Sequence, residues 1–174
     1  MILGIISDTH DKLESVERAF EFFAANKVKM VIHCGDWKSV LAMGHFAQQA
    51  AQYNMTVRGV LGNNDIDVSE FKKFIKSTPS DFQVIEGVFE INIDGKSVAI
   101  YHGHHASTLR KVRNDTSYKL VLLGHTHKPK IETTDTTVIV NPGSTAFSIP
   151  RSKQWQATVA LVDTDSVQAS LHTV

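Results

Sequence analysis

The first half of the chain alternates short apolar runs with segments that carry apolar residues at helical spacing. Continuous apolar runs are typical of strands buried on both faces, and spacings of three or four residues predict helices. The predicted strands are Ile2–Ile6, Val28–Cys34 and Met55–Gly62, and the predicted helices are Asp11–Ala25, Ser39–Tyr53 and Ser69–Ile75. Asp11 with Glu14 is a variant capping box for the first helix, and Ser69 is the expected N-cap of the third. Such β-α alternation favours a largely parallel sheet.

After Pro79 the pattern becomes mainly that of β-structure. Two alternating runs in Val88–Gly103 are joined by Asp94-Gly95, the strongest short signal for a hairpin. A short helix over Thr108–Asn114 and a buried strand over Lys119–Gly124 follow. The remaining β-rich segments are Lys130–Asn141 and Trp155–Val174. The simplest packing for this α/β (α+β) chain is two sheets face to face with the helices outside.

Composition narrows the class of protein. The 174 residues show no repeat and no linker, so we expect a single domain over residues 1–174. Eighteen basic and eighteen acidic residues give no basic field for a nucleic acid, and no apolar run is long enough to cross a membrane. Because the single cysteine, Cys34, cannot form an internal disulfide and the N-terminal residues lack a signal pattern, we expect a cytoplasmic protein.

Potential metal ligands follow five predicted strands at the point where each strand ends. They are Asp8, His10, Asp36, Asn63, His102, His125 and His127. Ligands bind beyond the carboxyl ends of strands in open α/β sheets, and turns do not require histidine. A shared metal site explains both facts. Seven ligands exceed the needs of one ion, so the sequence predicts a binuclear centre in which one carboxylate bridges two ions.

These residues fall into ordered motifs, and the chain resembles the calcineurin-like metallophosphoesterases of the small single-domain type. The motifs are DTH at Asp8–His10, GD at Gly35–Asp36, GNND at Gly62–Asp65, HGH at His102–His104, GHTH at Gly124–His127 and NPGS at Asn141–Ser144. The resemblance implies a four-layer αββα sandwich with two mixed sheets. It also implies that the first metal binds Asp8, His10 and His127, that the second binds Asn63, His102 and His125, and that Asp36 bridges them.

The resemblance implies a metal-dependent hydrolase, a phosphodiesterase in preference to a monoesterase, acting on a small phosphoester. In such an enzyme a hydroxide that bridges the two ions attacks phosphorus. All seven inferred ligands offer oxygen or nitrogen, which suits Mn²⁺, Zn²⁺, Fe, Co²⁺ or Ni²⁺. We expect Mn²⁺, since enzymes that resemble this chain are often active with it.

The GNND motif departs from the GNHD or GNHE of many family members, because Asn64 stands where they have a histidine. An amide can donate a hydrogen bond to a phosphate oxygen but cannot deliver a proton at neutral pH. We therefore expect Asn64 to bind substrate and take His104 as the candidate acid and a second substrate contact. Asp36, Asn63 and His104 form the expected catalytic set. Asp65 is expected to orient the loop.

Two alternatives remain open. One is a non-catalytic scaffold of the same fold, similar to the retromer subunit. The other is a nuclease, which the neutral charge and the lack of an accessory domain disfavour. His33, His45 and His172 are read as ordinary structural or surface histidines, and Trp37 and Phe147 as core residues. The oligomeric state stays open, a homo-oligomer included.

Overall fold

The computed structural model describes residues 1–146 and 156–174, which form two β-sheets and four helices. The strands are β1 (Ile2–Ile6), β2 (Met30–His33), β3 (Thr56–Val60), β4 (Phe82–Ile85), β5 (Phe89–Ile93), β6 (Lys96–Tyr101), β7 (Leu120–Leu123), β8 (Lys130–Thr133), β9 (Val138–Asn141), β10 (Thr158–Asp163) and β11 (Gln168–Thr173). The helices are α1 (Leu13–Ala25), α2 (Val40–Gln52), α3 (Val68–Ser77) and α4 (Ala106–Asn114).

Both sheets are mixed, as the sequence predicts. The six-stranded sheet has the order β11-β10-β1-β2-β3-β4. Strands β1 to β4 run parallel to one another, β10 is antiparallel to β1, and β11 is antiparallel to β10. The five-stranded sheet has the order β5-β6-β7-β9-β8, in which β6, β7 and β9 are parallel. The predicted Asp94-Gly95 turn joins β5 to β6.

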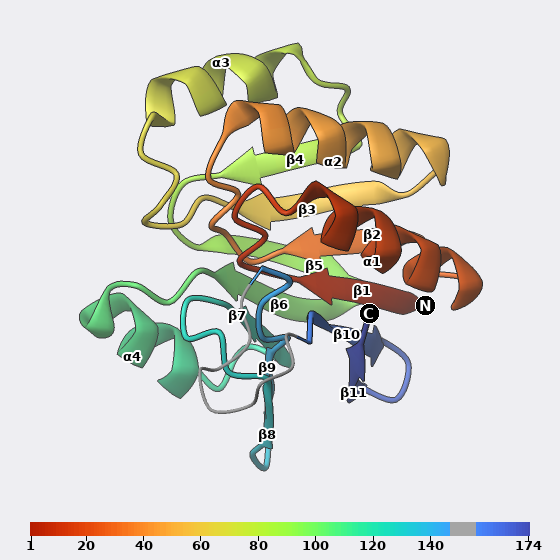
Figure 1. Cartoon of the computed structure of the whole chain (residues 1–174). Helices are drawn as coiled ribbons and strands as arrows, with labels where there is room; N and C mark the ends of the chain where they lie inside the picture. Colours follow the sequence, from red (N-terminus) through yellow and green to blue (C-terminus); the bar gives the residue numbers. More distant parts are fainter. Residues whose placement is uncertain (147–155) are drawn as a thin grey trace.

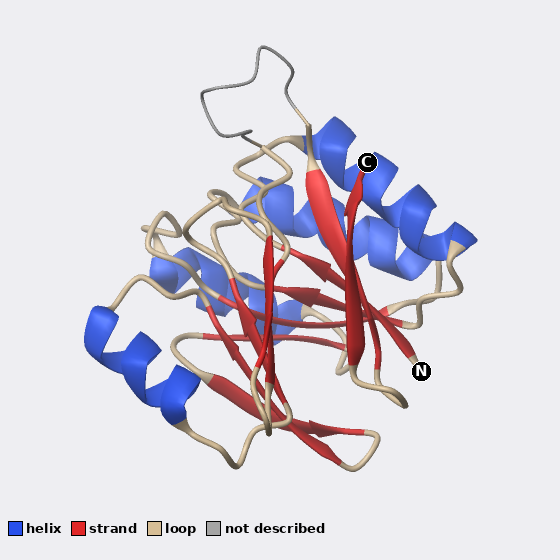
Figure 2. Ribbon diagram, turned by 90° about the horizontal axis from the view of Figure 1, so that it is seen from below, coloured by secondary structure: helices blue, strands red, loops and turns tan. Residues whose placement is uncertain are grey.

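Three separate apolar clusters show how the layers stack. One, with Phe20 and Phe46, lies between the six-stranded sheet and helices α1 to α3. A second, with Ile5 and Leu122, fills the space between the two sheets. The third, with Val112, packs α4 on the outer face of the five-stranded sheet. The helices therefore cover the outer faces of both sheets, which confirms the αββα sandwich (Figures 1 and 2).

Three details of the sequence prediction were wrong. Strand β4 was not foreseen, since its four residues follow a proline and alternate too briefly to stand out. Asp67, rather than Ser69, caps α3, with its Oδ1 accepting from the Glu70 amide. Helix α1 begins at Leu13 without a side-chain cap, because its N-cap residue is Lys12, and the Asp11 carboxylate accepts from the Ser39 hydroxyl at 2.6 Å.

Helix α4 begins two residues earlier than predicted, at Ala106. The start of the predicted segment Trp155–Val174 lies outside the described residues, and so does Phe147, which was predicted to be a core residue. Within the described part of the chain, no helix combines the length and apolar character needed to cross a lipid bilayer.

Candidate metal centre

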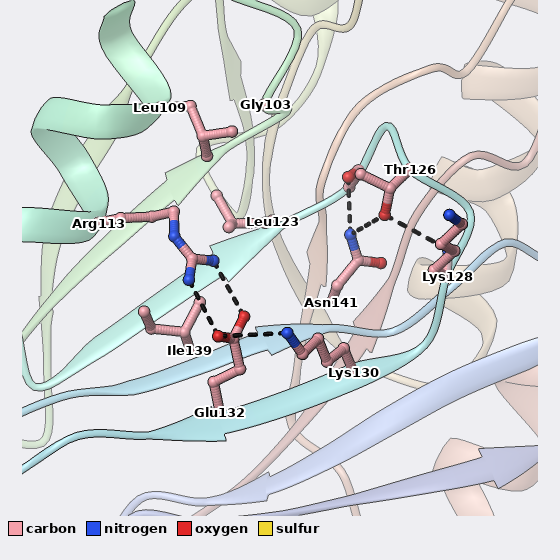
Figure 3. A pocket seen from close by; sticks show the side chains of 11 residues that line it. Gly103, Leu109, Arg113, Leu123, Thr126, Lys128, Lys130, Glu132, Ile139 and Asn141 are labelled. Carbon is pink, nitrogen blue, oxygen red and sulfur yellow. Dashed lines mark hydrogen bonds and ion pairs between the residues drawn. The ribbon is translucent and has the colours of Figure 1, made fainter. Parts of the chain in front are cut away.

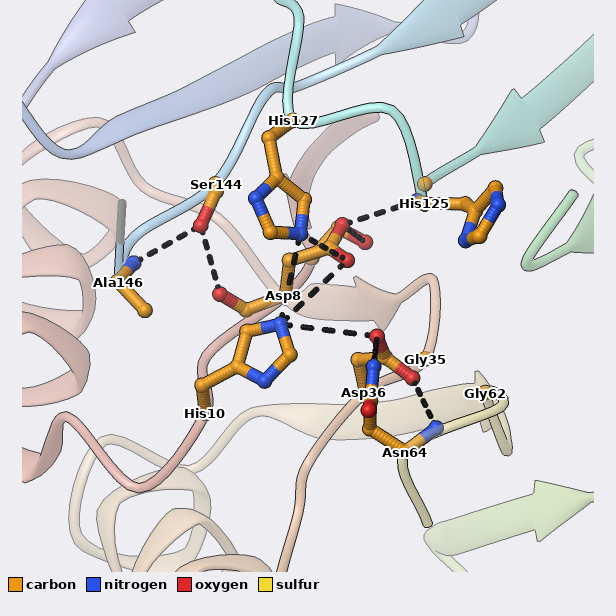
Figure 4. A network of polar contacts seen from close by, with 12 residues as sticks. Asp8, His10, Gly35, Asp36, Gly62, Asn64, His125, His127, Ser144 and Ala146 are labelled. Carbon is orange, nitrogen blue, oxygen red and sulfur yellow. Dashed lines mark hydrogen bonds and ion pairs between the residues drawn. The ribbon is translucent and has the colours of Figure 1, made fainter. Parts of the chain in front are cut away.

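The fold brings four of the predicted ligands together at one edge of the sandwich. They are Asp8 and His10 after β1, Asp36 after β2 and His127 after β7, and their ligand atoms all lie within 4.8 Å of one another. The Nε2 atoms of His10 and His127 are 3.4 Å apart. His127 Nε2 is 3.0 Å from Asp8 Oδ1, and His10 Nε2 is 3.6 Å from Asp36 Oδ2 (Figure 4). Loops from both sheets thus supply one compact set of nitrogen and oxygen atoms that could bind a metal, and we call these four residues the donor set.

Asp36 also faces a second group of predicted ligands. Its other oxygen, Oδ1, is 3.3 Å from His102 Nε2, and the same nitrogen is 3.1 Å from Asn63 Oδ1. The two carboxylate oxygens of Asp36 therefore point to different groups, which is the geometry that a bridging ligand requires. His125 is placed more loosely, with its ring centroid 5.1 Å from that of His102.

The donor chemistry fits a cation. His102 Nδ1 lies 2.8 Å from the carbonyl oxygen of Cys34, and because a carbonyl only accepts, Nδ1 carries the proton. The unprotonated Nε2 of the neutral ring then faces two oxygen acceptors, an arrangement that a positive ion stabilises. The buried Asp8 Oδ1 has the His127 Nε2 atom at 3.0 Å as a polar neighbour, and these two atoms could share a cation. Both observations indicate that divalent metal suits these residues.

The surroundings of Asp36 favour the ionised form of its carboxylate. Burial alone would raise its pKa, but the neighbouring His102 ring and the hydrogen bonds from Asn64 outweigh burial and hold the pKa well below the usual range. Asn64 donates twice, from its backbone amide to Oδ1 at 2.9 Å and from Nδ2 to Oδ2 at 2.6 Å. Asn64 thus fixes the orientation of the Asp36 carboxylate. Its predicted role in binding substrate stays a prediction.

The histidines titrate differently according to their neighbours. Burial lowers the pKa of His10 and of His125, which favours the neutral form of both rings at pH 7. The hydrogen bond to Asp8 raises the pKa of His127. For His102, burial works to lower the pKa, but the contacts with Asp36 and Asp8 raise it overall.

The backbone at the site is unusual in a way that the sequence did not reveal. Five of the seven predicted ligands have positive φ angles: Asp8 54°, His10 41°, Asp36 62°, His125 68° and His127 56°. Asp, Asn and His tolerate this left-handed region better than most residues, and such strain gathers at functional sites. The residues that allow the chain to turn in these loops are therefore the same residues that are predicted to bind metal.

Glycines allow the ligand loops to approach closely. A Cβ added at Gly62 would overlap the Asp36 carboxylate, and one at Gly124 would lie 3.0 Å from Asp8 Oδ2 and 2.8 Å from the Cys34 carbonyl oxygen. Because no side chain fits at either position, the GNND and GHTH motifs need their glycines for packing around the donor set.

Polar residues outside the donor set fix these loops. Asp65, buried as expected for an orienting residue, accepts hydrogen bonds from the amides of Gly62, Asp36 and Lys38 at 2.7, 3.1 and 2.7 Å. The Ser144 hydroxyl donates to the Asp8 carbonyl oxygen at 2.8 Å, a contact that the sequence analysis missed. Ser144 therefore holds the backbone of a predicted ligand.

The side chain of Asn141 fixes the GHTH loop by hydrogen bonds. Its Nδ2 donates to the Gly124 carbonyl oxygen at 2.7 Å and to the Thr126 hydroxyl at 3.1 Å. A recess of about 120 Å³ adjoins this contact, between α4 and β8, and the Arg113–Glu132 ion pair lines its far wall (Figure 3).

His104 lies beside the donor set. Its ring centroid is 5.5 Å from that of His102 and 4.2 Å from that of His105. Burial, together with these histidines, lowers its pKa. In the described part of the chain, the contacts of His104 do not include Asn64 or Asp36, so its catalytic role stays a prediction.

Residues 1–167 match the calcineurin-like phosphoesterase superfamily domain, and the chain belongs to that superfamily. It is 34% identical over 143 residues to Phosphodiesterase MJ0936 of Methanocaldococcus jannaschii, covering 82% of this chain and 83% of that protein. It is also similar to a solved archaeal phosphodiesterase, with a TM-score of 0.86 and 29% identity over the whole of both chains.

One further similarity concerns the fold alone. Vacuolar Protein Sorting 29 from Cryptosporidium parvum has a TM-score of 0.67 and 17% identity, covering 99% of this chain and 96% of that one. The family, the fold and the donor set together define this chain as a metal-dependent phosphoesterase.

Proposed function

We propose that this chain hydrolyses phosphodiesters with two divalent metal ions, Mn²⁺ in preference to Zn²⁺, Fe, Co²⁺ or Ni²⁺. The observation that carries the proposal is Asp36, whose two oxygens face two groups of predicted ligands. Asp8, His10 and His127 would hold one ion with it, and Asn63, His102 and His125 the other. The similarity to archaeal phosphodiesterases supports the preference for diesters.

Two bound ions supply a strongly nucleophilic water and neutralise charge on the phosphoryl oxygens. The protein supplies orientation. Asn64 and Asp65 fix the Asp36 loop, and the Cys34 carbonyl oxygen fixes the His102 ring. The Asn64 amide is the expected donor to a phosphate oxygen, which requires that it exchange its bond to Asp36 for one to substrate.

Removal and re-addition of metal test the proposal directly. The chelated protein should be inactive on bis(p-nitrophenyl) phosphate, and single metals should restore activity, with Mn²⁺ the most effective. The diester should be hydrolysed faster than p-nitrophenyl phosphate. Absence of activity on both esters with every metal would instead favour the non-catalytic scaffold, and faster hydrolysis of the monoester would overturn the preference for diesters.

His104 is proposed to assist departure of the leaving group. Replacing it with glutamine should leave the rate on bis(p-nitrophenyl) phosphate within about 3-fold, because p-nitrophenolate departs without protonation, but should slow diphenyl phosphate by about 100-fold. Release of the two phenols measures both rates. Equal rates for wild type and His104→Gln on diphenyl phosphate, with the same pH profile, would exclude this role.

We further propose that residues 1–174 act as one domain on a small phosphoester in the cytoplasm. The even balance of charge gives no support for a nucleic-acid substrate.

A further inference from the structure

His33 is the last residue of β2 and is fully buried. Its ring stacks on Trp37, with centroids 3.5 Å apart and planes at 15°, and Phe46 packs edge-on at 5.3 Å. Trp37 is itself anchored, since its Nε1 donates to the Val60 carbonyl oxygen at 2.9 Å. These contacts leave the imidazole no room to turn, so both ring nitrogens have fixed directions.

The partners of those nitrogens define the protonation of the ring. The Gly35 amide donates to Nδ1 at 3.1 Å, so Nδ1 is unprotonated. The proton of the neutral ring is then on Nε2, which donates to the Thr9 hydroxyl at 3.2 Å. Burial also lowers the pKa of His33, which agrees with a neutral ring.

These two hydrogen bonds join two ligand-bearing loops. Thr9 lies between Asp8 and His10, and Gly35 directly precedes Asp36. Two backbone bonds also link the loops, from the Asp8 amide to the Gly35 carbonyl oxygen and from the His10 amide to the Asp36 carbonyl oxygen, at 3.0 and 3.2 Å. The imidazole adds a rigid side-chain link between them through Thr9 and Gly35.

We propose that His33, as the Nε2-protonated tautomer, is a positioning residue that sets the separation of the Asp8–His10 loop from Asp36 and so prepares the shared metal site. This inference rests on the proposed metal-dependent function. A link of this kind matters because the loops lie beyond the last paired residues of β1 and β2, where only the two backbone bonds also join them. Residues that orient ligands typically change metal affinity by about 10- to 100-fold.

Thr9→Val is the sharpest test, since valine keeps the shape of threonine and removes the acceptor of the Nε2 proton. Thr137→Val is the matched control, because Thr137 is also buried and its hydroxyl donates to the Tyr118 carbonyl oxygen at 2.7 Å, away from the metal site. Calorimetric titration of chelated protein with Mn²⁺ should show affinity at least about 10-fold weaker in Thr9→Val. Thr137→Val should bind Mn²⁺ as wild type does.

The tautomer of His33 can be measured directly by NMR. In chelated protein labelled with ¹⁵N-histidine, the long-range spectrum should show His33 protonated at Nε2 and not at Nδ1. This measurement needs neither activity nor metal. The opposite tautomer would overturn the inference even if Thr9→Val weakened binding.

The outcomes separate this inference from the proposed function. If wild type fails to bind Mn²⁺ and every other divalent metal offered, the metal site is overturned and the inference falls with it. If wild type binds and Thr9→Val binds equally well, or no more weakly than Thr137→Val, only the positioning role of His33 is overturned. Thermal unfolding of the chelated proteins is to be measured first, and both valine variants should show a cooperative transition that marks them as folded before titration.

Discussion

Asp36→Asn is expected to lose more than about 100-fold in the rate of bis(p-nitrophenyl) phosphate hydrolysis while the protein stays folded. Changes to residues that merely orient ligands cost about 10- to 100-fold, so loss of a shared ligand should exceed that range. The reason is specific to this carboxylate, since its two oxygens face His10 and His102 at 3.6 and 3.3 Å. Asparagine keeps the shape but supplies no charge to either group.

The same variant should bind less metal. Bound metal per chain, measured by elemental analysis after gel filtration, should fall by about half, because a neutral amide bridges two cations poorly. Stability of the chelated protein should fall at neutral pH, because the lowered pKa of Asp36 means that its surroundings favour the anion, which asparagine cannot supply. Wild-type metal content with wild-type activity in Asp36→Asn would overturn the bridging role.

Asp67→Asn is the control for this experiment. Asp67 caps α3 from an exposed position just after the GNND motif, and asparagine caps helices equally well. Activity and metal content of Asp67→Asn should match wild type. A general sensitivity of the protein to loss of an aspartate charge would show in both variants.

The sequence predicted the arrangement of the site through its strands. Each apolar run ends where a buried strand must end, and parallel strands place their carboxyl ends together, so Asp8, Asp36 and Asn63 were expected at one edge. The resemblance added which histidines face which ion. Helix caps were predicted less well. The fold brings Ser39 to the Asp11 carboxylate, and the third helix begins one residue before Ser69, so that Asp67 caps it.

His33 and Asn64 show what the sequence could not give. His33 resembles any buried strand histidine until Thr9, from another loop, is placed 3.2 Å from its Nε2. Asn64 was read only against the histidine that it replaces, whereas its contacts with Asp36 depend on the backbone turn of the GNND loop. Roles that depend on contacts between distant loops need coordinates, since no local pattern encodes them.

Asp65→Ala is expected to be the most destabilising of the single changes considered at this site. The carboxylate accepts three backbone N–H groups, and alanine would leave the amides of Asp36, Gly62 and Lys38 without this acceptor. Each unsatisfied buried donor costs about 1–3 kcal/mol, so a net loss of about 3–5 kcal/mol in the free energy of unfolding is expected. Urea denaturation of chelated protein measures it.

The expected loss of stability in Asp65→Ala is large even though a buried site disfavours a charged carboxylate. Burial raises the pKa of Asp65 to about 6, and the bonds from Gly62 and Lys38 oppose that rise. Above pH 7 the group is ionised, because its hydrogen bonds to three N–H donors stabilise the anion. A side chain kept charged in a buried place is a strong sign that the loop depends on it.

Asp67→Ala separates loop support from the general cost of losing an aspartate. It removes an exposed helix cap two residues further along the chain and should cost about 1 kcal/mol, with activity unchanged. Asp65→Ala should also lose metal affinity, since Asp36 is held by one of the bonds it breaks. If the two alanine variants unfold at the same urea concentration and bind metal equally well, then Asp65 does not organise the GNND loop, and the Asp36 position must depend on its other contacts, those with Asn64 and His10 included.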